Sequence, residues 1–493
     1  MYRPLRILAI GLALFATACG RGNEGALELA IVGDADDPFE SGVLLSVAGQ
    51  HVHAATTEGL VGLDAQGQVI PALADRWIVT EDGQSYIFRL RDGTWPDGSE
   101  LTGESARTAL RRVVRSLAGT SMGYDLSQID EIRAMAGRVV EIRLKGPMPD
   151  FLQLLAQPEL GLALNGARNG RGTGPMSLRK VGDVAVLSML SPEARGLPQV
   201  ENWQEDVREL RVQGIDAKRA VALFDEGQVD VVLNGRIESL PLVDTGPLSR
   251  GTVRLDQAIG LFGLTVRNAH GILGDASGRE AISMAIDRAA LIAPFNVGGW
   301  QPTSRLVGPG LPGDLGTIGE RWAGTTIAQR RNMAAARVAT WKSLNGGASP
   351  EITIALPQGP GGDLLFRGLS GDMAAIGVNL RRAKKGETPD LELVDRVARY
   401  ANARWFLNQF NCGLKRGFCS SDADARVEEA SRSQDPDERA SLMAEAEAEL
   451  TALDAYIPFG PPMRWSLVRA GVDGFAANAW AFHPLPELAT ITK

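Results

Sequence analysis

The sequence is poor in cysteine and histidine, in net positive charge and in long apolar runs. Its 493 residues include three cysteines and four histidines, which leaves little material for a metal site. Lys and Arg total 51 against 59 Asp and Glu, a net charge of -8, so nucleic acid is not an expected partner. No segment after the N-terminus offers eighteen consecutive apolar residues, and we expect a soluble body.

The N-terminus resembles a bacterial lipoprotein signal. Two arginines precede an apolar run over residues 7–16, which is too short to span a bilayer. Small residues then lead to Cys19, at the position of the lipidated thiol of a lipobox. We expect residues 1–18 to be removed as a signal peptide and residues 19–26 to form a lipidated tether. The protein would then lie in the periplasm or cell envelope, anchored to a membrane through Cys19, with ordinary secretion as the alternative.

Export also bears on the other two cysteines. Cys412 and Cys419 are left as a pair in an oxidising compartment, so we expect a disulfide, with reduced thiols as the alternative. Closing this short loop contributes about 2.5 kcal/mol on the chain-entropy model.

Local patterns predict a mixed α/β fold. Leu27–Val32 is typical of a strand, and Ser85–Leu90 alternates polar and apolar residues as a strand with one buried face does. Thr102 is a suitable N-cap for a helix over Gly103–Leu117. The aromatic residues near these elements, namely Trp77, Tyr86 and Phe88, are expected in the core, not as ligand contacts.

Short motifs follow one another in a fixed order along most of the chain. The first group comprises Glu58-Gly59-Leu60, Pro71-Ala72-Leu73-Ala74, Trp77, Asp82-Gly83, Tyr86, Phe88, Leu90-Arg91, Asp97-Gly98 and Leu101-Thr102. Later matches are Gly172-Thr173-Gly174-Pro175, Ala220–Val232, Arg279–Arg288 and Asp435–Arg439. In combination they resemble the family 5 extracellular solute-binding proteins, the peptide, nickel and opine receptors of ATP-driven bacterial importers. Within this pattern Asp287 and Arg288 are expected to form a structural ion pair or cap.

The resemblance implies an α/β fold of the two-lobe, class II periplasmic-binding-protein type, in which the lobes close over a small molecule. An extra subdomain, Ib, is inserted in lobe I. The expected parts are lobe I at 27–50, 166–256 and 455–493, subdomain Ib at 51–165, and lobe II at 257–454. The crossings near Asp256 and Asp454 are hinge candidates. The implied partners are a small-molecule or peptide ligand and the permease subunits of an ABC transporter, and we expect a monomer.

The ligand-binding segment departs from the peptide receptors of the family. Where they carry a carboxylate for the peptide's amino terminus, this chain has Asn402, and an unpaired buried ammonium is costly. Arg404, with Lys415 or Arg416, is available for a carboxylate or phosphate. The predicted ligand-binding residues are Tyr400, Asn402, Arg404, Trp405 and Phe410, each with a solvated or core role as the alternative. A slip in the alignment would make Asp395 the relevant carboxylate.

These patterns favour an import receptor for a small organic solute. An oligopeptide-like ligand is the first expectation, an opine- or saccharide-like one the second, and a sensor or chaperone without transport the third. An enzyme is not expected, because the one nucleophile-elbow match, Gly119–Gly123, follows a helix instead of a strand. We expect no catalytic residues, no cofactor and no metal. His51 and His53, the one close histidine pair, would point to different sides of a helix.

Overall fold

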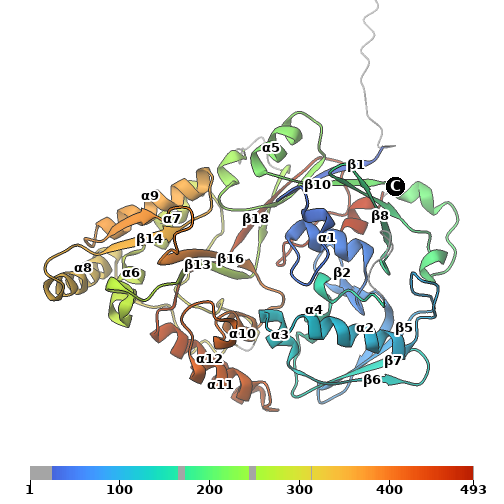
Figure 1. The fold of residues 1–493 in the computed structure, drawn as a ribbon, viewed down its shortest axis with the longest axis horizontal. Coiled ribbons are helices and arrows are strands. Elements are labelled where there is room, and N and C mark those ends of the chain that lie inside the picture. The colour runs from blue at the N-terminus through green and yellow to red at the C-terminus, as the bar shows by residue number, and fades with distance from the viewer. Residues whose placement is uncertain (1–24, 165–171, 244–250, 313, 492–493) are drawn as a thin grey trace, which may run out of the picture.

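Two lobes and a smaller subdomain make up the computed structural model, which describes residues 25–164, 172–243, 251–312 and 314–491 (Figure 1). The predicted signal peptide and Cys19 lie outside the described residues. Within the described parts of the chain, no helix combines the length and the apolar character needed to cross a bilayer.

Lobe I is built on a seven-stranded sheet in the order β12-β18-β11-β1-β10-β9-β8. Its central strand β1 (Leu27–Val32), predicted from the sequence, pairs in parallel with both β10 and β11. The other strands are β8 (Met176–Val181), β9 (Val184–Met189), β10 (Leu210–Ile215), β11 (Val231–Gly235), β12 (Val253–Gln257) and β18 (Met463–Val468). Helices α1 (Val47–Thr56), α5 (Ala217–Asp225) and α13 (Leu485–Ala489) complete the lobe. Because apolar residues of β1 face both α1 and α13, they form the centre of its core.

Subdomain Ib contains the antiparallel sheet β4-β5-β7-β6 and the hairpin β2-β3. Its strands are β2 (Val61–Leu63), β3 (Val69–Pro71), β4 (Ala74–Val79), β5 (Ser85–Leu90), β6 (Ile129–Met135) and β7 (Val139–Leu144), and its helices are α2 (Gly103–Ser116), α3 (Ser121–Leu126) and α4 (Phe151–Leu155). Thr102 caps α2 as predicted, because its side chain accepts a hydrogen bond from the Ser105 N–H at 3.1 Å. Tyr86 and Phe88 are buried in the core, also as predicted, and Trp77 packs against its edge.

Lobe II is built on a five-stranded sheet in the order β15-β14-β16-β13-β17. The strands are β13 (Gly260–Val266), β14 (Glu351–Ala355), β15 (Asn379–Arg382), β16 (Leu391–Val397) and β17 (Tyr456–Gly460). The helices are α6 (Ala276–Ala285), α7 (Arg288–Ile292), α8 (Ile327–Leu344), α9 (Pro360–Ala374), α10 (Ala403–Asn408), α11 (Ser421–Ala430) and α12 (Pro436–Ala452). Asp287 caps α7 by accepting from the Ala290 N–H, and the buried Arg288 donates to the Pro458 carbonyl at 2.7 Å. Both residues are therefore structural, as expected.

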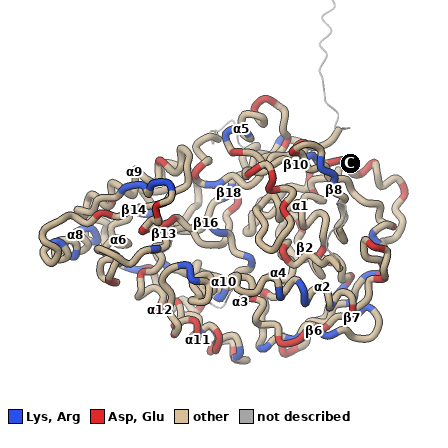
Figure 2. The backbone as a smooth tube through the Cα atoms, in the orientation of Figure 1, with Lys and Arg blue, Asp and Glu red and all other residues tan. Residues whose placement is uncertain are grey.

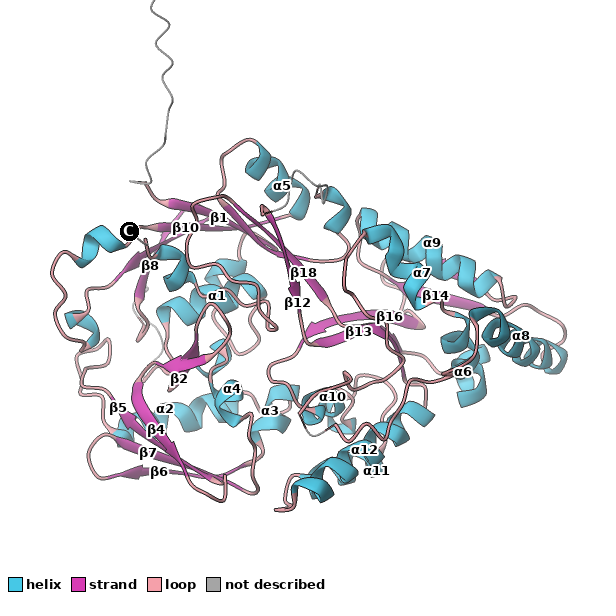
Figure 3. Cartoon of the chain, turned by 180° about the vertical axis from the view of Figure 1, so that it is seen from behind, coloured by secondary structure: helices cyan, strands magenta, loops and turns pink. Residues whose placement is uncertain are grey.

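Two short segments connect the sheets of the lobes (Figure 3). The first lies between β12 and β13, at residues 258–259, close to the predicted crossing at Asp256. The second was predicted near Asp454, but β17 still pairs with β13 in the lobe II sheet. The chain reaches the lobe I sheet only with β18, so the second crossing is Pro461-Pro462. The segment after residue 455 therefore begins in lobe II, because a distant pairing partner decides where β17 lies.

Lobe II also packs directly against subdomain Ib. One apolar core runs from the strands and helices of the subdomain to α10, α11 and α12. At this contact the buried Asp125 Oδ1 accepts from the Tyr400 hydroxyl at 2.7 Å and from Asn408 Nδ2 at 2.6 Å. We call these three residues the Asp125 latch, because they join the subdomain to lobe II.

Candidate ligand-binding site

A cleft with two compartments lies between the lobes. The first compartment, of about 370 Å³, is lined mainly by β13, β16 and the disulfide loop of lobe II. The second, of about 360 Å³, extends to α1 and α3 on the opposite side. The two share Arg236, Asp395, Arg396, Gln409 and Arg416, so they adjoin each other. Each is large enough for a small organic molecule.

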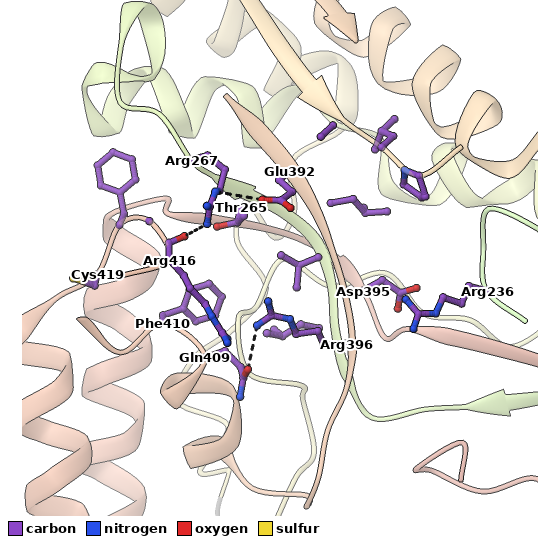
Figure 4. Close-up of a pocket in the computed structure, with 18 of the residues that line it drawn as sticks. Arg236, Thr265, Arg267, Glu392, Asp395, Arg396, Gln409, Phe410, Arg416 and Cys419 are labelled. Carbon is purple, nitrogen blue, oxygen red and sulfur yellow. Dashed lines mark hydrogen bonds and ion pairs between the residues drawn. The ribbon is translucent and has the colours of Figure 1, made fainter. Parts of the chain in front are cut away.

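The shared lining residues come from both lobes. Arg236 follows β11 of lobe I, whereas Asp395 and Arg396 lie at the end of β16 in lobe II (Figure 4). Figure 2 shows basic and acidic positions interspersed along the backbone, and β16 itself contains one basic residue, Arg396, beside the acidic Glu392 and Asp395. Arg396 Nη1 donates to Gln409 Oε1 at 3.3 Å, and the Arg416 carbonyl accepts from Arg267 Nη1 at 2.6 Å. The cleft is therefore lined by charged and polar groups of both lobes.

Three arginines of the cleft have carboxylate partners. Arg464 pairs with Asp395 at 2.7 Å, and Arg267 pairs with Glu392 at 3.3 Å. Arg399 of lobe II forms an ion pair with Glu159 of subdomain Ib. The Arg399 Nη1 atom also lies 3.2 Å from the side-chain oxygens of Gln50 and Gln157. This last group connects lobe II to both other parts of the protein.

Three other arginines have no carboxylate oxygen within ion-pair distance among the described residues: Arg236, Arg396 and Arg416. Burial lowers the pKa of Arg236, and the neighbouring Arg464 lowers it further. The Arg396 side chain still reaches solvent. Its pKa is lowered first by partial burial between the cleft walls and then by the positive charge of Arg416. The pKa of Arg416 is lowered first by burial and then by Arg267. Positive charge is thus in excess here.

Glu238 is a further carboxyl group of the cleft whose pKa is raised. Burial raises the pKa of Glu238, and the negative charge of Asp395 raises it further. Apolar walls lie beside these polar groups, with Phe410 in the first compartment and Trp405, Trp480 and Phe482 in the second. The lining therefore combines a basic surface with aromatic side chains.

The predicted ligand-binding residues fall into two groups. Trp405 and Phe410 line the cleft. Tyr400, Asn402 and Arg404 instead line a separate cavity of about 230 Å³ next to subdomain Ib. A ligand contact for these five residues stays a prediction.

Each residue of the second group makes contacts across the boundary with the subdomain. The Tyr400 hydroxyl bonds to Asp125, Asn402 Nδ2 donates to Asp150 Oδ2 at 3.2 Å, and Arg404 Nη2 donates to the Tyr124 carbonyl at 3.0 Å. Asn402 also caps α10, because its side chain accepts from the Arg404 N–H. These contacts hold α10 against subdomain Ib.

Asp395 and Arg416, the alternative ligand contacts expected from the sequence, both line the cleft. Arg464 neutralises Asp395, so this carboxylate is not free for a ligand ammonium group. Sequence reasoning missed Arg236, Arg396 and Arg399. Arg399 stands directly before the segment that was aligned with the family's ligand-binding motif, so a shifted alignment would have found it.

The histidine pair does not form a chelating site. His51 Nδ1 lies 2.7 Å from the Val47 carbonyl, and His51 Nε2 accepts from the His483 N–H at 3.3 Å, so both ring nitrogens have protein partners. Burial lowers the pKa of His51 to about 4, which keeps the ring neutral. Among the described residues, no group of three or more His, Cys, Asp and Glu side chains is arranged to hold a metal ion.

The disulfide predicted from the sequence is present and shapes one wall of the cleft. Cys412 and Cys419 are joined, and Cys419 lines the first compartment together with Arg416 from the same loop. The Cys412 N–H also donates to Asp424 Oδ2 at 2.9 Å, which holds the loop on α11. The disulfide therefore helps to position a cleft arginine.

Replacing both Cys412 and Cys419 by alanine is expected to lower the free energy of unfolding by about 2.5 kcal/mol, because the unfolded chain loses a loop constraint. Urea titration of the variant and of the wild type checks this. Cys19 must be absent from both proteins, so that reducing agent acts on the disulfide alone; the protein that keeps Cys412 and Cys419 is called the parent. Reduction should then lower the stability of the parent and leave the stability of the variant unchanged. Equal stability of parent and variant would contradict the prediction.

Comparison with known proteins assigns this architecture to a class. The structure matches Haemophilus influenzae OppA in complex with the peptide RPPGFSPFR at a TM-score of 0.78 and 17% sequence identity, over 95% of this chain and 99% of the other. It matches AgaA from Agrobacterium tumefaciens R10 in complex with agropinic acid at a TM-score of 0.70 and 18% identity, over 95% and 98%. At such identities the matches establish the fold: two lobes of the periplasmic-binding-protein type.

Residues 68–381 match the model for the middle region of the bacterial extracellular solute-binding proteins, family 5. The chain belongs to this family. It is also 28% identical to the nickel-binding periplasmic protein of Escherichia coli K12 over 274 residues, which are 52% of this chain and 51% of that relative. The match thus spans about half the length of this curated relative. The family assignment confirms the resemblance found in the sequence.

Proposed function

We propose that the protein is the solute receptor of an ABC importer, which captures a small organic solute by lobe closure and delivers it to permease subunits. The observation that carries this proposal is the cleft, whose walls come from lobes connected by two short crossings. Such a geometry allows a bound molecule to be enclosed and to change the outer surface of the protein. Peptide-like and opine-like solutes are the first candidates, in keeping with the ligands of OppA and AgaA.

We also propose that the receptor is a monomer and is tethered to a membrane through Cys19. The tether keeps a receptor near its permease, and two or more acyl chains give stable anchoring. Fractionation of the producing cells tests this part: the wild type is expected with the membranes and Cys19→Ala is expected in the soluble fraction. Equal distribution of the two proteins would leave the receptor without the proposed anchor.

Native mass spectrometry of the protein taken from its producing cell tests the capture of a solute. We expect a small organic molecule at one copy per chain, and we expect its removal and return to expand and compact the protein in small-angle scattering. Uptake by vesicles that contain the cognate permease would separate transport from a sensor or chaperone role. If no solute binds and the scattering profile is the same in all conditions, the receptor proposal fails. Chemical turnover of the solute would instead indicate an enzyme.

A further inference from the structure

The charges that line the cleft do not balance. Six arginines line its two compartments: Arg236, Arg267, Arg396, Arg399, Arg416 and Arg464. The acidic residues there number five: Asp125, Glu159, Glu238, Glu392 and Asp395. Three of these acids are engaged in ion pairs with cleft arginines. The other two are Glu238 and Asp125, which is held in the latch by the uncharged Tyr400 and Asn408. They leave an excess of one positive charge in the empty cleft, where Arg236, Arg396 and Arg416 have no ion-pair partner among the described residues.

We propose, on the basis of the receptor function proposed above, that the solute is an organic acid with at least two anionic groups, bound by Arg236, Arg396 and Arg416. Guanidinium groups bind carboxylate and phosphate oxygens with two parallel hydrogen bonds. A solute with two anionic groups can pair with Arg236 on one side of the cleft and with Arg396 or Arg416 on the other at the same time. The adjacent aromatic side chains accommodate an apolar portion of the same molecule.

The positions of the three arginines connect the charge of the solute to lobe closure. Arg236 belongs to lobe I, whereas Arg396 and Arg416 belong to lobe II. In the empty cleft, Asp395 of lobe II already pairs with Arg464 of lobe I, whereas Arg236, Arg396 and Arg416 have no such partner among the described residues. A solute with two anionic groups adds attraction to Arg236 on one side and to Arg396 and Arg416 on the other. The neutral analogue of such a solute lacks this effect, so it is expected to close the lobes poorly.

A pair of dipeptides that differ in charge tests this inference. Glu-Glu and Gln-Gln have the same backbone and nearly the same shape, but Glu-Glu carries two more negative charges. Calorimetry on protein stripped of any co-purified molecule should show tighter binding of Glu-Glu, by about 100-fold, and scattering should show compaction with Glu-Glu only. Inorganic phosphate is a third probe, because tighter binding of phosphate than of Glu-Glu would identify a phosphorylated solute at the same arginines.

Single substitutions test which arginines bind the acidic dipeptide. Arg396→Gln and Arg416→Gln are each expected to weaken Glu-Glu binding about 10- to 100-fold, which is typical for the loss of a charge-assisted hydrogen bond. Arg432→Gln is the matched control, because Arg432 is an exposed arginine just after the C-terminal end of α11 that pairs with Glu428 outside the cleft. The control should bind as the wild type does. The thermal unfolding temperature of each variant without ligand shows that it folds.

The outcomes separate this inference from the receptor function. Equal binding of Glu-Glu and Gln-Gln, or full binding by both arginine variants, would overturn the anionic class. A co-purified solute with fewer than two acid groups would overturn it as well, yet that result would support the receptor function. If neither a co-purified solute nor any probe binds, both proposals fail.

Discussion

Replacing Glu447 by glutamine is expected to lower the stability of the protein by about 3 kcal/mol. Glu447 on α12 is buried and accepts hydrogen bonds from Arg305 at 2.9 Å and from the Val307 N–H at 3.1 Å. Arg305 is also buried, and its other partner is Asp314 at 2.8 Å. Glutamine replaces one carboxylate oxygen by an NH2 group, which places a donor against the donors of Arg305 or Val307 in a buried position. Differential scanning calorimetry measures the loss.

A control for this change lies on the same helix. Glu445 pairs with Arg426 at 3.0 Å, and its side chain is 48% exposed. Glu445→Gln is therefore expected to change the stability by less than about 0.5 kcal/mol. If the two glutamine variants unfold at the same temperature, the buried group contributes no more than a surface ion pair. Because Arg305 and Val307 lie in the loop between α7 and α8, the Glu447 variant is also expected to show faster amide exchange there.

The parts of the fold that the sequence predicts correctly are those that depend on neighbouring residues. The cap at Thr102 and the alternation in Ser85–Leu90 are local patterns, and the structure contains both. The disulfide also joins residues that are close in sequence. The second crossing was placed too early, because β17 is held in lobe II by pairing with β13, a strand far away in the sequence. The residues of β17 alone do not indicate which strand it pairs with.

The same limit applies to the candidate site. The sequence identified Arg416, Asp395, Trp405 and Phe410, which belong to the segment that resembles the family's ligand-binding region. It missed Arg236, because the fold alone brings the end of β11 to the end of β16. Spacing along the chain also does not show which acids are already paired, and the excess of positive charge depends on that pairing.

The Asp125 latch gives the second large expected effect, a dependence of stability on pH. Burial raises the pKa of Asp125 from 3.8 to about 6, although the nearby Arg404 lowers it. The folded protein therefore binds this proton more tightly than the unfolded chain does. The contribution of Asp125 to stability is highest below about pH 4, falls as the pH rises toward 6, and is constant above. The difference between the two pKa values corresponds to about 3 kcal/mol.

Asp125→Asn removes this titration and keeps the side-chain oxygen that accepts from Tyr400 and Asn408. We expect the free energy of unfolding of the asparagine variant, relative to the wild type, to rise by about 3 kcal/mol between pH 4 and pH 7. Denaturant titrations at several pH values measure this difference, in which the contributions of other titrating groups cancel. An unchanged difference across this range would mean that Asp125 titrates normally in the folded protein.

Asp125→Ala separates the charge of the latch from its hydrogen bonds. Without the carboxylate, the Tyr400 hydroxyl and the Asn408 amide lose their shared acceptor in a buried position, so we expect the alanine variant to be about 2–4 kcal/mol less stable than the asparagine variant at every pH. Because the latch joins subdomain Ib to lobe II, the alanine variant without ligand is also expected to have a larger radius of gyration than the asparagine variant. Equal radii would show that the apolar core shared by the subdomain and α10–α12 is sufficient to hold the lobes together. In that case subdomain Ib and lobe II would behave as one unit, and ligand-induced closure would have to move lobe I toward that unit.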